Sequence, residues 1–291
     1  KEHWQLYLII LIPLALLIPF SYVPMYGILL AFKDYKTKLG IMGSPFATPW
    51  YKHFRNFFKS YYFKRLLGNT LILSLYSLVA GFPIAIILAV FINECRHKVV
   101  QSVTYAPYFI STVVMVSIIT LVLSPRNGIV NMIIEALGGE AVDFMGRPDL
   151  FRHVYVWSGV WQGTGFASVI YIAALSGVDP SLHEAAEIDG ANRLRRIWHI
   201  DLPSIRPTII TLLILNIGSV MNVGYEKVLL MQNNLNRSTS DIISTYVYEI
   251  GLINHNYGMS TAVNLFNSVI NIILLVLANQ LSRKLTDTSI I

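Results

Sequence analysis

Six long stretches without a charged residue divide this chain of 291 residues. They are Gln5–Phe32, Leu66–Asn93, Val99–Pro125, Val154–Val178, Pro207–Tyr225 and Ile250–Ser282. A helix needs about 20 predominantly apolar residues to cross a bilayer, and each stretch reaches roughly that length. Helices satisfy their own backbone hydrogen bonds, which a lipid environment demands. We therefore expect an all-α integral membrane protein with six transmembrane helices and one membrane-spanning domain over 1–291.

The spans are expected where these stretches are most apolar. They are predicted at about 6–32, 67–93, 100–124, 154–177, 207–228 and 259–282. The composition excludes an ordinary soluble domain, because 54% of the residues are hydrophobic and only 13% are charged. The first stretch does not read as a cleaved signal peptide, since its apolar run is too long and prolines interrupt it. Because the chain starts at Lys1 without Met, native N-terminal residues are expected to be missing.

Several kinds of chemistry have no signature in this chain. No glycine is followed by lysine, so the phosphate loop Gly-x-x-x-x-Gly-Lys-Ser/Thr is absent from the sequence. No serine sits in a nucleophile-elbow context. The single cysteine, Cys95, excludes an internal disulfide, and no Cys/His cluster suggests a metal site. We expect no catalytic residue, no metal and no cofactor in this chain.

The segment between the fourth and fifth stretches, 179–203, reads as a short helical hairpin. Two starts are open for its first helix. Asp179 can precede Pro180 at the first helical position, where the missing N–H costs nothing. Alternatively, Ser181 and Glu184 can form a capping box that starts the helix two residues later.

A turn and a second helix complete this hairpin. Asp189 and Gly190 form a turn pair, because glycine takes a positive φ without strain. The second helix is expected from Ala191 to about Asp201 and to end at Pro203, because proline disfavours helix in the residue before it. Its basic side chains are Arg193, Arg195, Arg196 and His199. A helical hairpin this short is marginal in water, so we expect it to rely on a partner surface.

Seven positions of this segment match a known pattern: Glu184, Ala185, Ala186, Gly190, Ile200, Leu202 and Pro203. The string resembles in full the EAA loop of permease subunits of ATP-binding-cassette (ABC) importers. In that family the loop is a cytoplasmic helix–turn–helix that docks into a groove on the partner ATPase. The resemblance implies that the ATPase-coupling residues are Glu184, Ala185, Ala186, Asp189, Gly190, Arg193, Arg196 and Pro203.

Shorter motifs extend the resemblance to nearly the whole chain, roughly Tyr7 to Leu285. They are Pro24-Met25-Tyr26-Gly27, Ala31-Phe32-Lys33-Asp34-Tyr35, Asn69-Thr70-Leu71 and Gly128-Ile129-Val130-Asn131. These motifs look like the LplB-type branch of the carbohydrate-importer permeases, which belongs with the maltose-importer membrane subunits. That branch is associated with complex saccharides, including uronic-acid oligosaccharides such as alginate fragments. The resemblance implies a type I ABC importer with the MetI/maltose-permease-like fold.

The resemblance also implies the partners and the location. A second, non-identical permease subunit completes the pathway, and two cytoplasmic ABC ATPases bind ATP and Mg and supply the energy. An extracytoplasmic solute-binding protein delivers the saccharide. The chain would lie in a bacterial plasma (inner) membrane as a multi-pass protein with both termini cytoplasmic. No nucleic-acid partner is expected, because the net charge of +6 is spread around the membrane ends.

A simple charge count opposes this orientation. The side that carries both termini holds nine lysines and arginines, whereas the other side holds thirteen, eight of them in the first loop. The positive-inside rule alone therefore favours the reverse topology. We expect the first loop, 33–65, to lie in the extracytoplasmic interface instead, because its lysines and arginines alternate with aromatic residues as in an amphipathic interfacial helix.

Polar groups inside a membrane bundle are candidates for a substrate path, because polar side chains facing lipid are unfavourable. Three groups qualify: Asn264, Asn267 and Asn271 on one face of the last span, Asn216, Ser219 and Asn222 in the fifth, and Trp157 and Trp161 one turn apart in the fourth. Amides bind hydroxyls and carboxylates, and flat aromatic rings stack on sugars. The same residues also fit a purely structural role, since polar side chains hold helices together.

The function hypothesis is therefore the permease subunit of an importer that moves an oligosaccharide or polysaccharide fragment inward by alternating access. One alternative keeps this architecture but carries a peptide, an amino acid or an anion. Another is an ATP-independent secondary transporter or channel, which leaves the EAA resemblance unexplained. An intramembrane enzyme is a fourth reading, against which the missing catalytic cluster counts.

Overall fold

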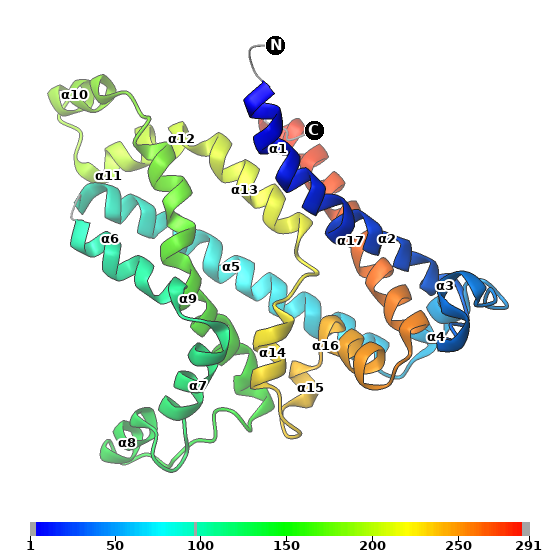
Figure 1. The fold of residues 1–291 in the computed structure, drawn as a ribbon. Coiled ribbons are helices and arrows are strands. Elements are labelled where there is room, and N and C mark those ends of the chain that lie inside the picture. The colour runs from blue at the N-terminus through cyan, green and yellow to red at the C-terminus, as the bar shows by residue number, and fades with distance from the viewer. Residues whose placement is uncertain (1–3, 96–97, 287–291) are drawn as a thin grey trace. The chain divides into compact units, whose positions relative to one another are not determined.

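The computed structural model describes residues 4–95 and 98–286, almost all of them in helices (Figure 1). The longer helices are α1 (Trp4–Leu17), α5 (Phe63–Cys95), α6 (Lys98–Tyr105), α7 (Thr112–Val122), α9 (Pro148–Leu175), α13 (Arg206–Gly218) and α17 (Tyr257–Thr286). The shorter ones are α2 (Val23–Met25), α3 (Gly40–Gly43), α4 (Lys52–Lys59), α8 (Ile129–Ala136), α10 (Pro180–Ile188), α11 (Arg193–Arg196), α12 (Leu202–Ser204), α14 (Tyr225–Met231), α15 (Arg237–Ser240) and α16 (Ile243–Tyr248). Lys1 and Arg96, which enter the charge count, lie outside the described residues. The prediction of a helical membrane protein is confirmed.

Membrane-length helices occur in two forms within the described ranges. Three segments are long and apolar enough to cross a bilayer as they stand: Tyr7–Phe32, Phe63–Cys95 and Tyr257–Lys284. Three further pairs of helices pass the same test together but are bent by 96°, 77° and 62°. If each bent pair is one span, the total is up to six.

The sharpest bend separates α6 from α7 and has a local cause. The 3-10 turn Ala106–Phe109 ends α6, and Ser111 then starts α7 as its N-cap. Gln162 of α9 donates its side-chain amide to the carbonyl of Ile110 at 2.8 Å, so a neighbouring helix satisfies the backbone at the break. Gly165 of α9 lets α6 approach closely, because a Cβ there would stand 2.0 Å from the Thr104 carbonyl oxygen.

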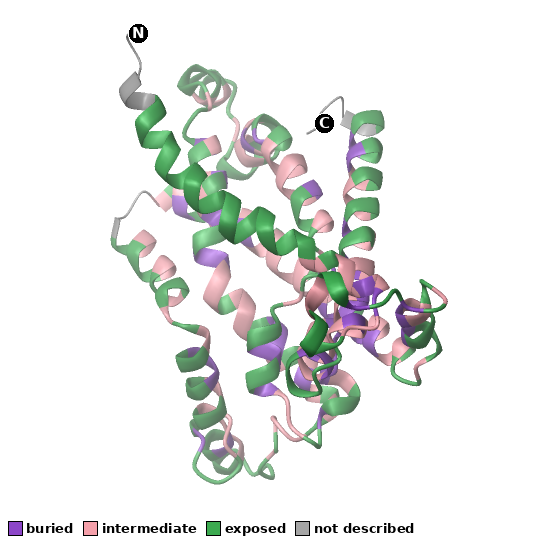
Figure 2. Ribbon diagram, turned by 45° about the vertical axis from the view of Figure 1, so that its right-hand side comes forward, coloured by how far each residue is buried: buried purple, intermediate pink, exposed green. Residues whose placement is uncertain are grey.

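The chain forms two compact units, the first of which joins its N-terminal part, up to Phe63, to Tyr246–Ser268. The fully buried Phe57 of α4 is the centre of its aromatic core, with ring contacts to Phe63, Tyr246 and Phe266. By contrast, α1 is exposed from Tyr7 onward (Figure 2). An apolar helix without buried residues is suited to a lipid or protein environment.

The first loop of this unit, 33–65, contains one short helix of mixed basic and aromatic residues, and its interfacial position stays a prediction. Helix covers Lys52–Lys59 and two shorter turns, because glycines and prolines interrupt the remainder. The buried Lys33 donates from Nζ to the carbonyls of Ile41 and Met42 at 2.8 and 2.9 Å. Asp34 pairs with Lys52 at 2.9 Å. The Ala31–Tyr35 motif therefore organises the fold of this loop.

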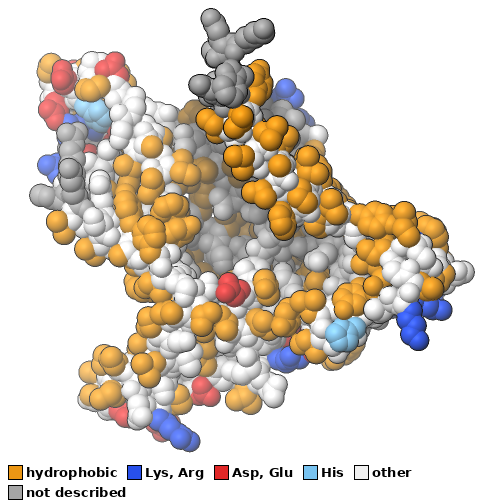
Figure 3. Space-filling model, in the orientation of Figure 1, with side chains coloured by type: hydrophobic (Ala, Val, Ile, Leu, Met, Phe, Trp, Pro, Cys, Tyr) orange, Lys and Arg blue, Asp and Glu red, His pale blue; other side chains and the backbone are white. Residues whose placement is uncertain are grey.

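The second unit, 64–245 and 269 onward, contains two hydrophobic clusters joined by α5 and α9. One cluster comprises Leu73, Val116, Phe151, Tyr155, Val156, Val228, Met231 and Ile242. The other comprises Ala85, Ala89, Tyr171, Leu175 and Ile205. Figure 3 shows charged side chains gathered over α10 and α11, whereas hydrophobic side chains predominate over α7, α8 and α9. The hairpin thus forms a polar end of this unit.

Candidate functional site

The fifth apolar segment is broken in its middle. Helix α13 ends at Gly218 after 13 residues, which is about 20 Å of helix and too short for a bilayer about 30 Å thick. Non-helical backbone runs from Ser219 to Gly224 before α14 begins. The predicted span 207–228 is therefore not one continuous helix in this structure. Its sequence explains the break, because Asn, Ser and Gly favour turns over helix.

Asn271 of α17 satisfies the backbone at this break. Its side-chain oxygen accepts the backbone N–H of Met221 at 3.0 Å, and its amide donates to the side-chain oxygen of Asn222 at 3.0 Å. Gly218 packs closely on the same helix, since a Cβ there would lie 2.3 Å from a methyl group of Leu275. Asn271 is 8% exposed and acts as a structural link between the two segments.

The break lines a pocket of about 560 Å³ between α5, α9 and the α13–α14 segment. We call it the polar pocket. Its polar side chains are Ser74, Ser77, Tyr155, Gln162, Thr164, Tyr171, Asn216, Ser219, Asn222 and Lys227. The buried hydroxyl of Ser74 has no hydrogen-bond partner within the described part of the chain. Irregular backbone at membrane depth is tolerated where it lines a cavity, and this break meets that condition.

Lys227 of α14 is the charged member of this wall, and the sequence interpretation overlooked it. Its side chain is buried, with the residue 8% exposed. Its Nζ donates to the carbonyl of Tyr155 at 2.8 Å and lies 4.7 Å from the centre of the Tyr155 ring. Its position next to the uncharged stretch Pro207–Tyr225 could have identified it as a candidate path residue, because ionisable groups within a membrane are rare and mark substrate pathways.

Three of the predicted path residues share one site. Asn216, Ser219 and Asn222 line the polar pocket together. Asn264, which is exposed, and Asn267 fall in the first unit, whereas Asn271 falls in the second.

The two tryptophans are absent from the polar-pocket wall. Trp157 borders a second, apolar pocket of about 410 Å³ and donates its indole N–H to the Tyr76 hydroxyl at 2.9 Å. Trp161 is 54% exposed. The tryptophan prediction therefore has no support from the geometry of the polar pocket.

The hairpin begins at the first of its two predicted starts. The Asp179 side chain accepts the backbone N–H of Ser181 at 2.9 Å, with Pro180 at the first helical position. This hydrogen bond lowers the pKa of Asp179, because it stabilises the carboxylate. Gly190 has a φ of +73°, so the predicted glycine turn is confirmed.

The second arm of the hairpin differs from the prediction at both ends. It begins at Arg193 rather than Ala191, because the Asn192 side chain caps it by accepting the backbone N–H of Arg195 at 2.9 Å. It also continues through Pro203 into α12, so the expected stop at Pro203 is wrong. The wider π-helix Ile197–Asp201 precedes the proline, and this geometry accommodates a ring that clashes within a regular α-helix.

An ion pair and a histidine–carboxylate contact connect the arms of the hairpin. Arg196 pairs with Glu187, and His183 Nε2 lies 3.3 Å from the Asp201 carboxylate. Asp201 is 3% exposed, and this burial raises its pKa, although His183 opposes the shift. The coupling residues named from the sequence thus belong to one cross-linked element. Its first arm, which carries Glu187, also carries Glu184, Ala185 and Ala186, and Asp189 caps the end of that arm.

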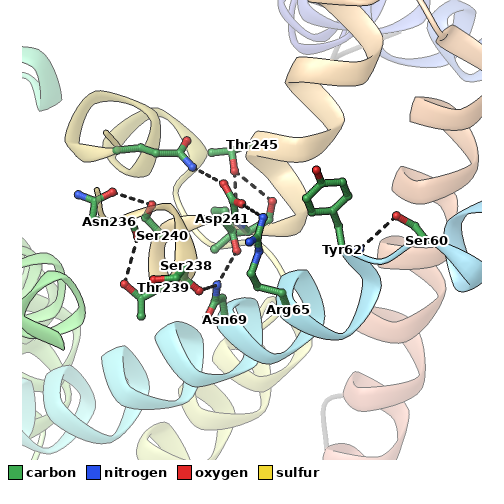
Figure 4. A network of polar contacts seen from close by, with 12 residues as sticks. Ser60, Tyr62, Arg65, Asn69, Asn236, Ser238, Thr239, Ser240, Asp241 and Thr245 are labelled. Atoms are coloured by element: carbon green, nitrogen blue, oxygen red, sulfur yellow. Dashed lines mark hydrogen bonds and ion pairs between the residues drawn. The ribbon is translucent and has the colours of Figure 1, made fainter. Parts of the chain in front are cut away.

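A second polar cluster, the Asp241 network, fastens the loop between α14 and α16 to α5 (Figure 4). Arg65 donates to Asp241 at 2.5 Å, and Gln232 donates to the same carboxylate. Asn69, one turn from Arg65 on α5, donates to the carbonyls of Ser238 and Asp241, both at 3.0 Å. The Asn69-Thr70-Leu71 motif is therefore structural in this unit.

The Gly128–Asn131 motif is structural as well. Asn131 is 2% exposed, donates to the Ser124 and Val142 carbonyls at 3.0 Å, and accepts the Val142 N–H at 2.8 Å. A Cβ on Gly128 would lie 2.5 Å from backbone oxygens. Together these residues fold the loop around α8.

Membrane-length helices, a broken segment beside a polar pocket and a polar hairpin are the features expected of a helical membrane permease. Residues 81–287 match the family described as "Binding-protein-dependent transport system inner membrane component". The chain belongs to this family of membrane permeases, which confirms the family resemblance found in the sequence.

Two related permeases are similar to this chain over nearly its full length. Protein LplB of Bacillus subtilis (strain 168) is 44% identical over 98% of this chain and 90% of its own length. The polygalacturonan/rhamnogalacturonan transport system permease protein YteP of the same organism is 42% identical, over 99% and 91%.

Two solved structures are similar over almost the full chain. One is a bacterial ABC transporter involved in the import of the acidic polysaccharide alginate, with a TM-score of 0.88, 38% identity and coverage of 98% of this chain and 97% of that chain. The other is a bacterial alginate ABC transporter in complex with a periplasmic protein bound to an alginate pentasaccharide. Its TM-score is 0.89 at 37% identity, and the match covers 100% of this chain and 98% of that chain. The ABC-importer permease fold predicted from the sequence is confirmed.

Proposed function

We propose that this chain forms one half of the pathway of an ATP-driven importer that moves an oligosaccharide or polysaccharide fragment into the cytoplasm by alternating access. The observation that carries the proposal is the broken fifth segment, whose amides and hydroxyls line the polar pocket. A saccharide presents many hydroxyl groups, and side-chain amides both donate to and accept from them. Relatives that import polygalacturonan, rhamnogalacturonan and alginate support the cargo class.

The partners follow from the same proposal. A solute-binding protein delivers the saccharide, and a second, non-identical permease subunit closes the pathway. Two cytoplasmic ATPases bind ATP and Mg and dock on the hairpin 179–203. Because an ion pair and a histidine–carboxylate contact join the arms of this hairpin, it is suited to move as one body when the ATPases close.

Copurification tests the partner assignment. A tagged version of this chain, extracted from its native host, should bring down two ATPase polypeptides and a second permease. Recovery of the chain alone, in a folded state that still transports the saccharide, contradicts an ATP-driven mechanism.

A strained turn tests the coupling role. A Gly190→Val change places a β-branched residue at φ +73°, which costs about 1 kcal/mol or more. The matched control is Gly138→Val, at φ +85° in the loop after α8, where an added Cβ also meets no atom within 4 Å. Both variants should insert normally.

Only Gly190→Val should leave ATP hydrolysis unresponsive to the loaded binding protein. Glu184→Lys, which reverses a charge in the first helix of the hairpin, should weaken ATPase binding in the same assay. Full transport by both hairpin variants rules out this coupling role.

Cys95, at the end of α5, reports the proposed orientation with both termini cytoplasmic. It should resist a membrane-impermeant maleimide in intact cells and react after the membrane is opened. Ready labelling from outside supports the reverse topology that the charge count favours.

A further inference from the structure

The polar pocket contains a buried ammonium group that forms no ion pair with the described part of the chain. Lys227 is 8% exposed and lines the pocket wall. Within the described ranges, none of the ion pairs involves Lys227. A buried charge is costly unless it is paired and hydrogen-bonded, so an uncompensated ammonium in a pocket indicates a ligand of opposite charge.

The surroundings hold this ammonium in place and leave it bonding capacity. One of its contacts is the Tyr155 carbonyl at 2.8 Å, and the Tyr155 ring lies on the same group. An ammonium has three N–H donors, so this backbone contact uses a fraction of them. Gly159 makes room for it on α9, because an added Cβ would lie 3.2 Å from Nζ.

The neighbouring groups suit the remainder of a sugar acid. Asn222 and Gly224 line the same wall from the break, and Gln162 lines it from α9. Amides bind ring hydroxyls, whereas an ammonium binds a carboxylate through a charge-assisted hydrogen bond, which is stronger than a neutral one. A neutral saccharide would leave the ammonium unpaired.

We propose that Lys227 is the specificity-determining residue of the polar pocket and binds a carboxylate of a uronic-acid unit, so that the pathway favours acidic over neutral saccharides. This inference rests on the proposed function and specifies the substrate class of the same pocket. Lys227 would thus make the membrane subunit itself selective for acidic saccharides, in addition to any selection by the binding protein.

Direct binding to the purified, assembled transporter tests the inference without the binding protein. The probes are radiolabelled trigalacturonate and α-1,4-linked galactotriose, which share a linkage and differ in charge. The wild type should bind trigalacturonate at least about tenfold more tightly, since a hydrogen bond to a charged group contributes about one tenfold step or more. Lys227→Met should remove this difference, and Lys227→Arg should retain most of it.

A second variant keeps the lysine and moves it. Gly159→Ala should reduce the preference for trigalacturonate, whereas Gly68→Ala, where an added Cβ meets no atom within 4 Å, should not change it. This pair decides the question if Lys227→Met does not assemble.

The outcomes separate the two proposals. Equal affinity for both probes in the wild type, or equal loss of both in Lys227→Met, overturns the role of Lys227 and leaves saccharide transport standing. Binding of neither probe by the wild type overturns the assignment of the pocket to saccharides.

Discussion

Two polar regions of the second unit differ in where the hydrogen bonds of their side chains end. In the Asp241 network, Arg65, Gln232 and Asn69 bind a carboxylate and the carbonyls of one loop. In the broken fifth segment, Asn216 is exposed and its amide donates to the Leu212 carbonyl of its own helix. The first arrangement holds three segments together, whereas the second presents polar groups to a pocket.

This difference in hydrogen bonding separates intramembrane polar residues that hold the fold together from those that can bind a substrate. A buried group whose hydrogen bonds all end on the protein contributes to the fold, because breaking it leaves a desolvated partner. A polar group that bonds only its own helix and faces a cavity remains able to bind a solute. Asn271 belongs to the first kind although it lies beside the second, since it closes the break through Met221 and Asn222.

The largest effect is expected from Asp241→Ala. Removing the carboxylate breaks the Arg65–Asp241 ion pair, in which the aspartate is buried, and costs about 3–5 kcal/mol. Thermal unfolding of the purified permease in detergent should show a much lower midpoint, and assembly should fail. Glu140→Ala, which removes an exposed carboxylate, is the control. An unchanged midpoint for Asp241→Ala removes the distinction between the two regions.

A smaller effect is expected from Asn271→Ala. The change removes the Asn271 acceptor from the Met221 N–H and the Asn271 donor from the Asn222 side-chain oxygen, at a cost of about 1–3 kcal/mol. Stability and transport should fall together, whereas Gln280→Ala, on an exposed position of the same helix, should change neither. Reduced transport at full stability instead places Asn271 in the substrate path.

Asn216→Ala should separate transport from stability. Its amide is exposed and bonds within its own helix, so the free energy of unfolding should change by less than about 0.5 kcal/mol. Transport of the saccharide should nevertheless fall several-fold with the ATPases still bound. A stability loss as large as that of Asn271→Ala assigns Asn216 to the fold.

The smallest effect is expected at Asp201. Like Asp241 it is a buried carboxylate, but its partner is His183, whereas the partner of Asp241 is an arginine. Burial raises its pKa in the folded state, so the folded protein holds this proton more readily than the unfolded chain. Its stabilising contribution is therefore complete below the unfolded pKa of about 3.9 and is lost as the pH rises through the folded value.

Asp201→Asn mimics the protonated form and should flatten this dependence, with a change of less than about 1 kcal/mol at neutral pH. Thermal unfolding between about pH 4 and 7 measures it. An unaltered slope shows that Asp201 does not contribute.

Local signals explain what the sequence predicted well. Runs of apolar residues predict membrane helices because each residue contributes independently to partitioning. Gly190 was expected to adopt a positive φ because Asp-Gly is a turn pair, and it does. The start of α10 remained open between two local caps of similar quality, and the structure selects Asp179.

The errors lie where a distant segment or an irregular turn intervenes. Pro203 did not end the hairpin, because a π-helix before it makes room for the ring. The break at Gly218 was missed, although the short fifth stretch with its Asn, Ser and Gly residues was a signal for it. The tryptophan pair is a different case, because its contact with a sugar stays a prediction: neither residue lines the wall of the polar pocket.

The amino-acid sequence by itself determined the class of this protein, its membrane-length helices, its hairpin and its family, because these depend on local composition and spacing. Only the tertiary structure decided that Asn271 closes a break, that Asn216 and Asn222 line a pocket, and that Lys227 stands in its wall. The physical reason is that the hydrogen bonds of a buried polar group depend on the segments that pack against it. For Lys227 the partner is the Tyr155 carbonyl, 72 residues away along the chain.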